Sequence, residues 1–247
     1  SVSISQDVDL DTLTNGGHLE IGGSITVGVF EQHGTLTGIN GAALGKVVAG
    51  SFYTSVGGVY NDLTVTGTLN NTGADLTLTG EIGTAEKGAV VTTNGGSLAV
   101  NGAVHSYRID MQNGNIAIND GPLELTGGWF MVTGTGNEVL QAQEVIVKGN
   151  GTVYGSELKA DVLTVDGTEG NRLFTVSYSN DETLTNPGKL NVNTLVLEGD
   201  ANFQHHDREN PLEVNKVVLK TTSSNYFQTY GGMKIGSMEV EGDARVD

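Results

Sequence analysis

A ten-residue pattern that recurs in the second half of the chain constrains the fold more than any other feature. It has apolar residues at its first, third, sixth and eighth places, Gly, Asp, Asn or Gln at the fourth and Gly at the tenth. Chance predicts roughly one such match or fewer in a chain of this composition, so the repetition reflects the structure. Four copies keep the whole pattern and a fifth, at Leu212, lacks only the final glycine; the four begin at Leu140, Leu158, Leu190 and Met233.

The pattern describes two short strands separated by a corner. Side chains alternate along a strand, so the two apolar residues before the corner and the two after it would all point inward. The closing glycine permits the positive φ that a tight corner often needs. In chain order the copies start 18, 32, 22 and 21 residues apart, which is typical of one coil of a β-solenoid, and the long step leaves room for an inserted loop.

The sequence therefore predicts an all-β protein, a single-stranded, right-handed parallel β-helix with coils of about 18–22 residues and inserted loops. A β-sandwich would also contain many short strands, but its hairpins would show two-residue turns rather than one recurring corner. Two windows with helix-forming residues, 137–148 and 155–165, overlap copies of the pattern, so we expect strands there as well.

We expect residues 1–247 to form one continuous solenoid segment without a linker. Residues 1–136 are looser and rich in Asn-Gly and Gly-Gly turn signals, whereas residues 137–247 carry the regular pattern. A solenoid needs capped ends, and no polar capping segment follows the last copy. We therefore expect the segment to be part of a longer chain.

Composition excludes several classes of function. The net charge of -17, with only 12 Lys and Arg residues, opposes binding to nucleic acid or to anionic membranes, which both require basic patches. The longest apolar runs are only a few residues, so we expect no direct membrane insertion by this segment. The absence of cysteine excludes disulfides and thiolate metal sites and is compatible with export. These features favour an extracellular or cell-surface protein.

Several shorter runs resemble those of a known group of proteins. Residues 63–69 (LTVTGTL), 75–80 (DLTLTG) and 163–167 (LTVDG), together with the ten-residue pattern, resemble passenger regions of bacterial autotransporter-type surface proteins and related secreted β-helix adhesins. The resemblance implies a rod exported across the outer membrane and held at the cell surface by a C-terminal β-barrel. It also implies a role in adhesion, aggregation or presentation of an effector, and it identifies no functional residue.

An acidic row near the N-terminus could suggest calcium. Asp7, Asp9 and Asp11 alternate along an expected strand, but Thr12 and His18 occupy the places where a calcium loop needs Gly and Glu. We therefore expect a solvated strand face. No cofactor is expected, and Ca²⁺ is the one ion that the acidic composition would attract.

The adjacent residues His205, His206 and Asp207 are the candidates for a metal or acid-base role. Neighbouring residues of an extended chain point to opposite sides, so two adjacent histidines do not readily chelate one ion without a turn. We expect a solvated loop at this position.

Aromatic residues offer a better indication of binding. We expect most of the short clusters of aromatic residues to stack inside the solenoid. In the pair Trp129-Phe130, however, one ring would face inward and the other outward. An aromatic flank could stack on sugars or contact a protein. The candidate binding residues are Trp129, Tyr178, Tyr226 and Tyr230.

The sequence thus favours a non-enzymatic adhesin-like rod that binds a cell-surface glycan or protein, or mediates cell-cell aggregation, through weak contacts strengthened by avidity. One alternative is a polysaccharide lyase or hydrolase, because parallel β-helices host such enzymes and paired carboxylates perform the chemistry. The pairs Glu198 with Asp200 and Asp207 with Glu209 have suitable spacing, although nothing singles them out. Another alternative is a structural β-helix that self-associates through exposed coil ends.

Overall fold

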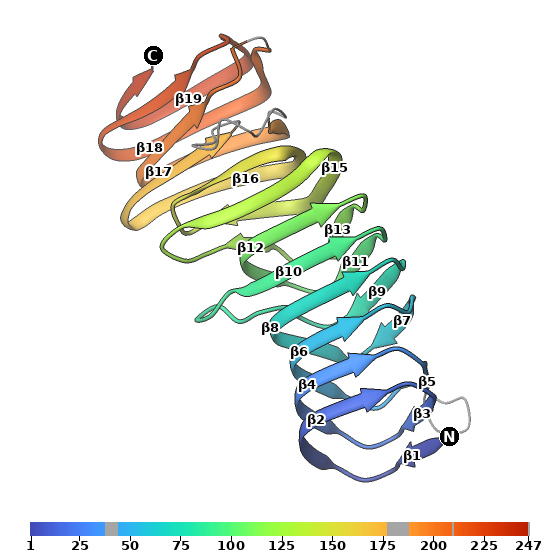
Figure 1. Ribbon diagram of the computed structural model, residues 1–247. Helices are drawn as coiled ribbons and strands as arrows, with labels where there is room; N and C mark the ends of the chain where they lie inside the picture. The colour runs from blue at the N-terminus through green and yellow to red at the C-terminus, as the bar shows by residue number, and fades with distance from the viewer. Residues whose placement is uncertain (38–43, 177–187, 209, 247) are drawn as a thin grey trace.

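The computed structural model describes residues 1–37, 44–176, 188–208 and 210–246. These residues form an elongated stack of roughly ten turns, with the two chain termini at opposite ends of the rod (Figure 1). Every strand pairing among them is parallel, which confirms the predicted β-solenoid. Within these ranges no helix is long and apolar enough to cross a membrane.

The N-terminal part of the rod is built from short strands, several to a turn. One row pairs in chain order through β2 (Val8–Asn15), β4 (Ile25–Gln32), β6 (Val47–Thr54), β8 (Leu63–Thr72), β10 (Ala89–Asn94), β12 (Val104–Gln112) and β14 (Leu123–Leu125). A second row contains β7 (Gly58–Asn61), β9 (Leu76–Thr79), β11 (Leu98–Asn101) and β13 (Ile116–Asp120). At the N-terminal end, β1 (Val2–Ile4), β3 (His18–Ile21) and β5 (Thr35–Thr37) form a separate sheet.

In the C-terminal part the strands are longer and wind around much of a turn, as Figure 1 shows. They are β15 (Phe130–Val147), β16 (Gly151–Val176), β17 (Lys189–His205), β18 (Leu212–Thr229) and β19 (Met233–Val246). The window 155–165 lies within β16, and the window 137–148 lies in β15 except for its last residue, so both are strands as expected.

The copies of the ten-residue pattern lie directly above one another. Leu140 pairs with Leu158, Leu158 with Leu190, and Leu212 with Met233. In the second copy all four apolar residues are buried, from Leu158 to Val165. The long step before Leu190 therefore separates two turns that stay in register, as the spacing predicted.

The closing glycines do not all act as the sequence suggested. Gly199 and Gly242 have φ values of 61° and 95°, in the left-handed region, but Gly149 and Gly167 do not adopt a positive φ. At Gly149 an added Cβ would overlap the carbonyl oxygen of Gly127 in the turn below, and Gly167 is likewise pressed against neighbouring backbone. Close approach between turns, in addition to corner conformation, thus keeps glycine at the end of the pattern.

Phenylalanine rings form a ladder inside the C-terminal half of the rod. Phe130, Phe174, Phe203 and Phe227 follow one another at centroid distances of 6.0, 5.8 and 5.3 Å, and all four are buried. This confirms the internal stacking expected for most aromatic groups. Aromatic pairs at such distances contribute about 0.5–1.5 kcal/mol beyond the area that they bury.

A polar column runs along one corner of the N-terminal turns. The register aligns five buried side chains, each directly above the last: Asn15, Gln32, Thr54, Asn71 and Thr93. Asn15 Nδ2 donates to Gln32 Oε1 at 2.9 Å, and Asn71 Nδ2 donates to the carbonyl oxygen of Ala74 at 2.7 Å. Because buried polar atoms are costly without partners, these bonds help to fix the corner conformation at Asn15 and Asn71.

Candidate functional site

A groove beside the middle of the rod is lined by two exposed aromatic rings. Trp129 is 51% exposed and Tyr107 is 41% exposed. Both line a hollow of about 470 Å³, here called the aromatic groove, together with Ala85, Glu86, Lys87, Gly88, Thr126, Gly127, Gly128, Lys148 and Glu169. Aromatic surface of this size is normally buried, so its exposure beside a groove makes the groove a candidate binding site.

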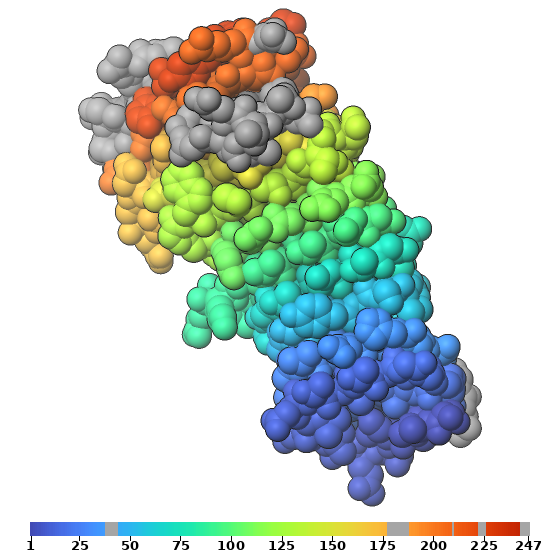
Figure 2. Space-filling view, in the orientation of Figure 1, coloured from blue at the N-terminus to red at the C-terminus, as the bar shows by residue number. Residues whose placement is uncertain are grey.

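Local backbone geometry places Trp129 on the outside. Phe130 begins β15 and is fully buried in the ladder, so alternation directs the preceding side chain outward. Gly127 turns the chain just before it with φ of 96°. On the other side of the groove a tight turn, closed by the N–H of Lys87 donating to Thr84 O at 3.1 Å, belongs to the segment that juts from the rod in Figure 2.

A buried carboxylate holds Lys148, one of the lysines that line the groove, in place. Glu124 accepts hydrogen bonds from Lys148 Nζ and His105 Nδ1, both at 2.9 Å. Burial opposes ionisation of Glu124, but the hydrogen bonds and charges of Lys148 and then His105 prevail and lower its pKa. The ammonium of Lys148 is thus fixed at the edge of the aromatic groove.

The aromatic groove continues into a smaller hollow of about 250 Å³. Ala85, Lys148 and Glu169 line both, and Asp166 and Arg172 complete the described lining of the smaller one. Burial tends to raise the pKa of Asp166, but hydrogen bonds from the Thr168 hydroxyl and N–H lower it. Positively charged donors and negatively charged acceptors therefore lie next to an aromatic wall. This combination suits hydroxyl-rich or mixed polar ligands.

A second aromatic patch lies near the C-terminal end. Tyr230 is 42% exposed, and its ring stacks on that of His206 at a centroid distance of 4.5 Å and an interplanar angle of 25°. Gln204 and Gln228 join the two rings by hydrogen bonds, including His206 Nε2–H to Gln204 Oε1 at 3.1 Å. Tyr226 is half-buried. Its pKa is raised mainly by this burial and, to a smaller extent, by the nearby Tyr230.

The two adjacent histidines point to opposite sides, as expected, but they do not lie in a solvated loop. His205 is the last residue of β17 and is only 4% exposed, whereas His206 faces the surface stack. Asp207 accepts hydrogen bonds from the N–H and Nδ2 of Asn210 at 3.0 and 2.8 Å. Among the described residues no group of three or more His, Asp or Glu side chains is arranged to hold a metal ion.

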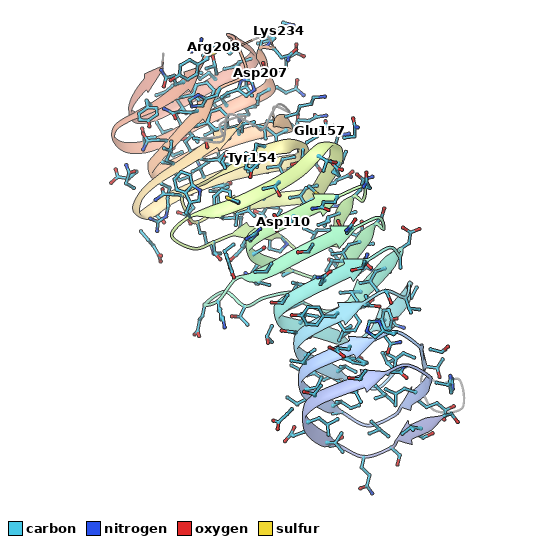
Figure 3. All side chains as sticks on the ribbon, in the orientation of Figure 1. Asp110, Tyr154, Glu157, Asp207, Arg208 and Lys234 are labelled. Carbon is cyan, nitrogen blue, oxygen red and sulfur yellow. The ribbon has the colours of Figure 1, made fainter. Side chains whose placement is uncertain are left out.

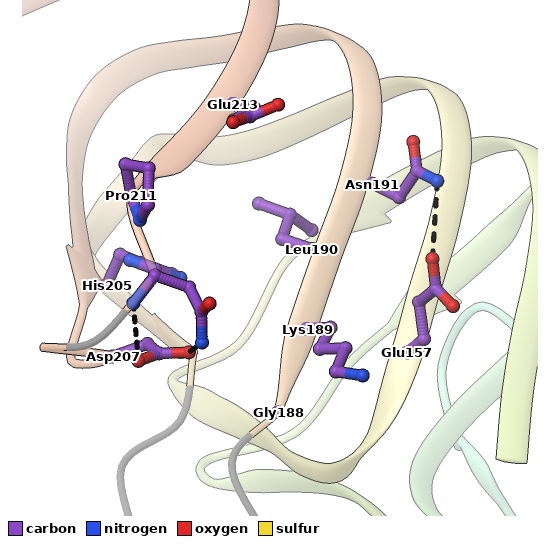
Figure 4. Close-up of a pocket in the computed structure, with 10 residues that line it drawn as sticks. Glu157, Gly188, Lys189, Leu190, Asn191, His205, Asp207, Pro211 and Glu213 are labelled. Carbon is purple, nitrogen blue, oxygen red and sulfur yellow. Dashed lines mark hydrogen bonds between the residues drawn. The ribbon is translucent and has the colours of Figure 1, made fainter. Parts of the chain in front are cut away.

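His205 lines a cavity of about 500 Å³ at the mouth of its turn, here called the His205 cavity (Figure 4). It lies in the C-terminal half of the rod, where Figure 3 labels Glu157 and Asp207. One wall comes from Glu157 of β16 and the start of β17, and the other from the chain that follows β17. The lining residues are Glu157, Gly188, Lys189, Leu190, Asn191, His205, Asp207, Asn210, Pro211 and Glu213.

Other candidates from the sequence are scattered. Asp7, Asp9 and Asp11 are exposed, which fits a solvated strand face. Glu198 forms an ion pair with Lys220, with Oε1 and Nζ 3.7 Å apart. Tyr178 and Glu209 lie outside the described residues.

The sequence reading missed Tyr107 and Lys148, which complete the aromatic groove around Trp129. The signal was available for Tyr107, because it precedes Trp129 by about one coil and turns stack in register. Lys148 had no such signal, since its position depends on the buried Glu124 carboxylate.

The fold defines this chain as a parallel β-solenoid with an aromatic groove on its flank. No protein-family model, curated protein or solved structure matches it.

Proposed function

We propose that this chain is a non-enzymatic, surface-exposed or secreted adhesin-like rod. It binds a glycan or protein on a cell surface through the aromatic groove, with the Tyr230 patch as a second contact. The resemblance to autotransporter passengers supports the bacterial cell surface as the place where it acts.

One observation carries the proposal: the only tryptophan of the chain is half exposed beside a second exposed ring. The core does not need Trp129, because Phe130 already occupies the inward position and continues the ladder. Exposed aromatic residues are enriched where proteins bind partners, since one large rigid side chain supplies much contact area at little entropic cost.

The chemistry of the groove fits a hydroxylated ligand. The apolar face of a sugar ring can pack on Trp129 and Tyr107, while Lys148 and Glu169 lie within the same groove to donate to and accept from hydroxyl groups. Each contact is weak, but many rods on one cell would act together and raise the apparent affinity.

Binding to an array of neutral and acidic oligosaccharides, and to cells, tests the proposal. The Trp129→Ala variant should bind at least about fivefold more weakly than wild type, because an aromatic contact contributes about 1 kcal/mol or more. Trp129→Phe should retain part of the affinity. Tyr53→Ala, which removes an exposed ring elsewhere, is the matched control and should bind like wild type; equal binding by Trp129→Ala would contradict the proposal.

Glycan cleavage is the second candidate function, and the His205 cavity favours it. Glu157 and Asp207 lie on opposite walls of that cavity (Figure 4), and paired carboxylates that flank a saccharide perform hydrolysis in most glycosidases. Release of reducing ends or unsaturated products from polysaccharides that bind the protein would favour cleavage. Binding without product, in the same samples, would favour the adhesin.

A further inference from the structure

A histidine occupies an interior position that neighbouring turns give to smaller side chains. His205 pairs with Val176 in the turn below and with Thr229 in the turn above. The alternation along β17 places Phe203 and His205 inward and Gln204 between them at the surface. A solenoid core would be filled by valine at this position, so packing alone does not explain the imidazole.

The imidazole is also incompletely satisfied. His205 is 4% exposed, and its Nδ1 atom is buried without a hydrogen-bond partner among the described residues. Such an atom costs free energy in the unliganded protein, and this cost is relieved when a ligand supplies the missing hydrogen bond. Burial lowers the pKa of His205; the charge of Asp207 opposes this shift and that of His206 adds to it. The ring is therefore neutral at pH 7, and one of its nitrogens is a hydrogen-bond acceptor.

The walls of the His205 cavity carry two carboxylate-amide pairs. On one wall Asn191 Nδ2 donates to Glu157 Oε1 at 3.2 Å, and on the other Asn210 Nδ2 donates to Asp207 Oδ2 at 2.8 Å. Each pair holds its carboxylate in one orientation, and the Glu157–Asn191 pair keeps further lone pairs and an amide hydrogen for a ligand. Pre-oriented acceptors and donors of this kind suit the adjacent hydroxyl groups of a sugar.

Charge and size narrow the ligand further. Among the described residues that line the cavity, Glu157, Asp207 and Glu213 face Lys189, and Lys159 and Lys234 lie 3.6 Å from Glu157 and 2.6 Å from Glu213. The charges around the cavity therefore balance, which favours a neutral ligand. Its volume of about 500 Å³ lies within the roughly 300–1,000 Å³ of small-molecule sites. Leu190 and Pro211 add apolar surface for the carbon face of a ring.

We propose that the His205 cavity binds one neutral pyranose unit, with His205 Nδ1 accepting a hydrogen bond from a sugar hydroxyl and the Glu157–Asn191 pair holding further hydroxyls. The ligand class rests on the proposed adhesin function, but the site uses none of the residues of the aromatic groove. The cavity would select a terminal or branching sugar of a glycan whose remainder lies along the flank.

NMR titration of the whole chain with D-glucose, D-galactose, D-mannose and N-acetyl-D-glucosamine tests the proposal, with D-glucuronate as the anionic counterpart. At least one neutral sugar should shift the ring-nitrogen resonances of His205 in a saturable way, and D-glucuronate should bind more weakly. His205→Val, which restores the residue type of the turn below, should weaken binding about tenfold by removing a buried hydrogen bond. The exposed-site variant His18→Val is the control for the substitution itself and should bind like wild type.

Glu157→Gln provides a second variant that keeps side-chain shape, and it should also weaken binding. Saturable binding that His205→Val leaves unchanged, preferential binding of D-glucuronate, or no shift of the His205 resonances by any neutral sugar would each overturn the proposal. The ring-nitrogen resonances of His205 report on the His205 cavity, whereas the glycan-binding assay with Trp129→Ala reports on the aromatic groove. Failure of the aromatic groove as a site is thus distinguished from failure of the His205 cavity.

Discussion

The rings of Phe130 and Phe174 meet at a centroid distance of 6.0 Å although the turn between them places Gly151 against Phe130. Two rings can meet across an intervening turn only because that turn contributes no side chain at this point. An added Cβ on Gly151 would lie 2.6 Å from the ring of Phe130 and would overlap its carbonyl oxygen.

Gly151→Ala should therefore destabilise the protein by about 2 kcal/mol, as expected for an overpacked core. Urea unfolding followed by circular dichroism measures the change. Gly16→Ala is the control, because an added Cβ there meets nothing within 4 Å, and it should change stability by less than about 0.5 kcal/mol. A Gly151→Ala variant as stable as wild type would show that the ladder is looser than the structure indicates.

Glu138→Gln should destabilise the protein strongly at neutral pH. The Glu138 side chain is almost fully buried, and its carboxylate accepts from the N–H groups of Asn113, Thr135 and Gly136 at 2.9, 2.7 and 3.0 Å and from the Thr135 hydroxyl. Burial opposes ionisation, but these hydrogen bonds lower the pKa of Glu138 from 4.5 to about 2. A shift of this size corresponds to a stabilisation on the order of 3 kcal/mol at pH 7.

The sign of this contribution fixes its pH dependence. The pKa of Glu138 is lower in the folded state, so its stabilisation is full above pH 4.5 and is lost as pH falls towards about 2. Unfolding free energies of wild type and Glu138→Gln should differ most at pH 7 and converge near pH 2. The exposed variant Glu144→Gln is the control, and a constant difference between wild type and Glu138→Gln across pH would refute the assignment.

Asn71→Leu should cost about 1–3 kcal/mol, because the half-buried Ala74 carbonyl would lose its donor within the polar column. Asn71→Thr should be better tolerated, since Thr54 and Thr93 occupy the same column in the turns on either side. Thermal unfolding of the two variants side by side measures the difference. The reverse order of stability would mean that the column acts by packing rather than by hydrogen bonding.

His205→Val should make the protein less sensitive to mild acid. Burial lowers the folded-state pKa of His205, so as pH falls below 6.5 the unfolded chain takes up a proton that the folded protein does not. The unfolding free energy of the wild type should decline between pH 7 and pH 5, whereas that of His205→Val should decline less. The gap between the two unfolding free energies should therefore change over that range. A gap independent of pH would contradict a buried neutral imidazole.

The solenoid was predictable because the repeat itself indicates which residues of neighbouring turns pair. Once Leu140, Leu158 and Leu190 were aligned, stacking them in register gave the pairing that the structure has. The outward position of Trp129 followed from strand alternation beside Phe130.

The sites were less predictable because they depend on contacts between turns. The Glu138 carboxylate binds N–H groups from its own corner and from Asn113, one turn away, and no spacing rule marks such a partner. The His205 cavity likewise joins the start of one turn to the chain that leaves it, across the long step before Leu190. Sequence patterns report which residues face inward, but not which polar atom among them lacks a partner.

The parallel stacking of the turns has a mechanical consequence. Each turn is held mainly by its two neighbours along the rod, so a pull on the two ends would peel turns away in succession rather than rupture the whole protein at once. Each detached turn of about 20 residues would lengthen the chain by roughly 70 Å. For a rod fixed to a surface and attached to a moving partner, this stepwise yielding would spread a sudden load over many small extensions.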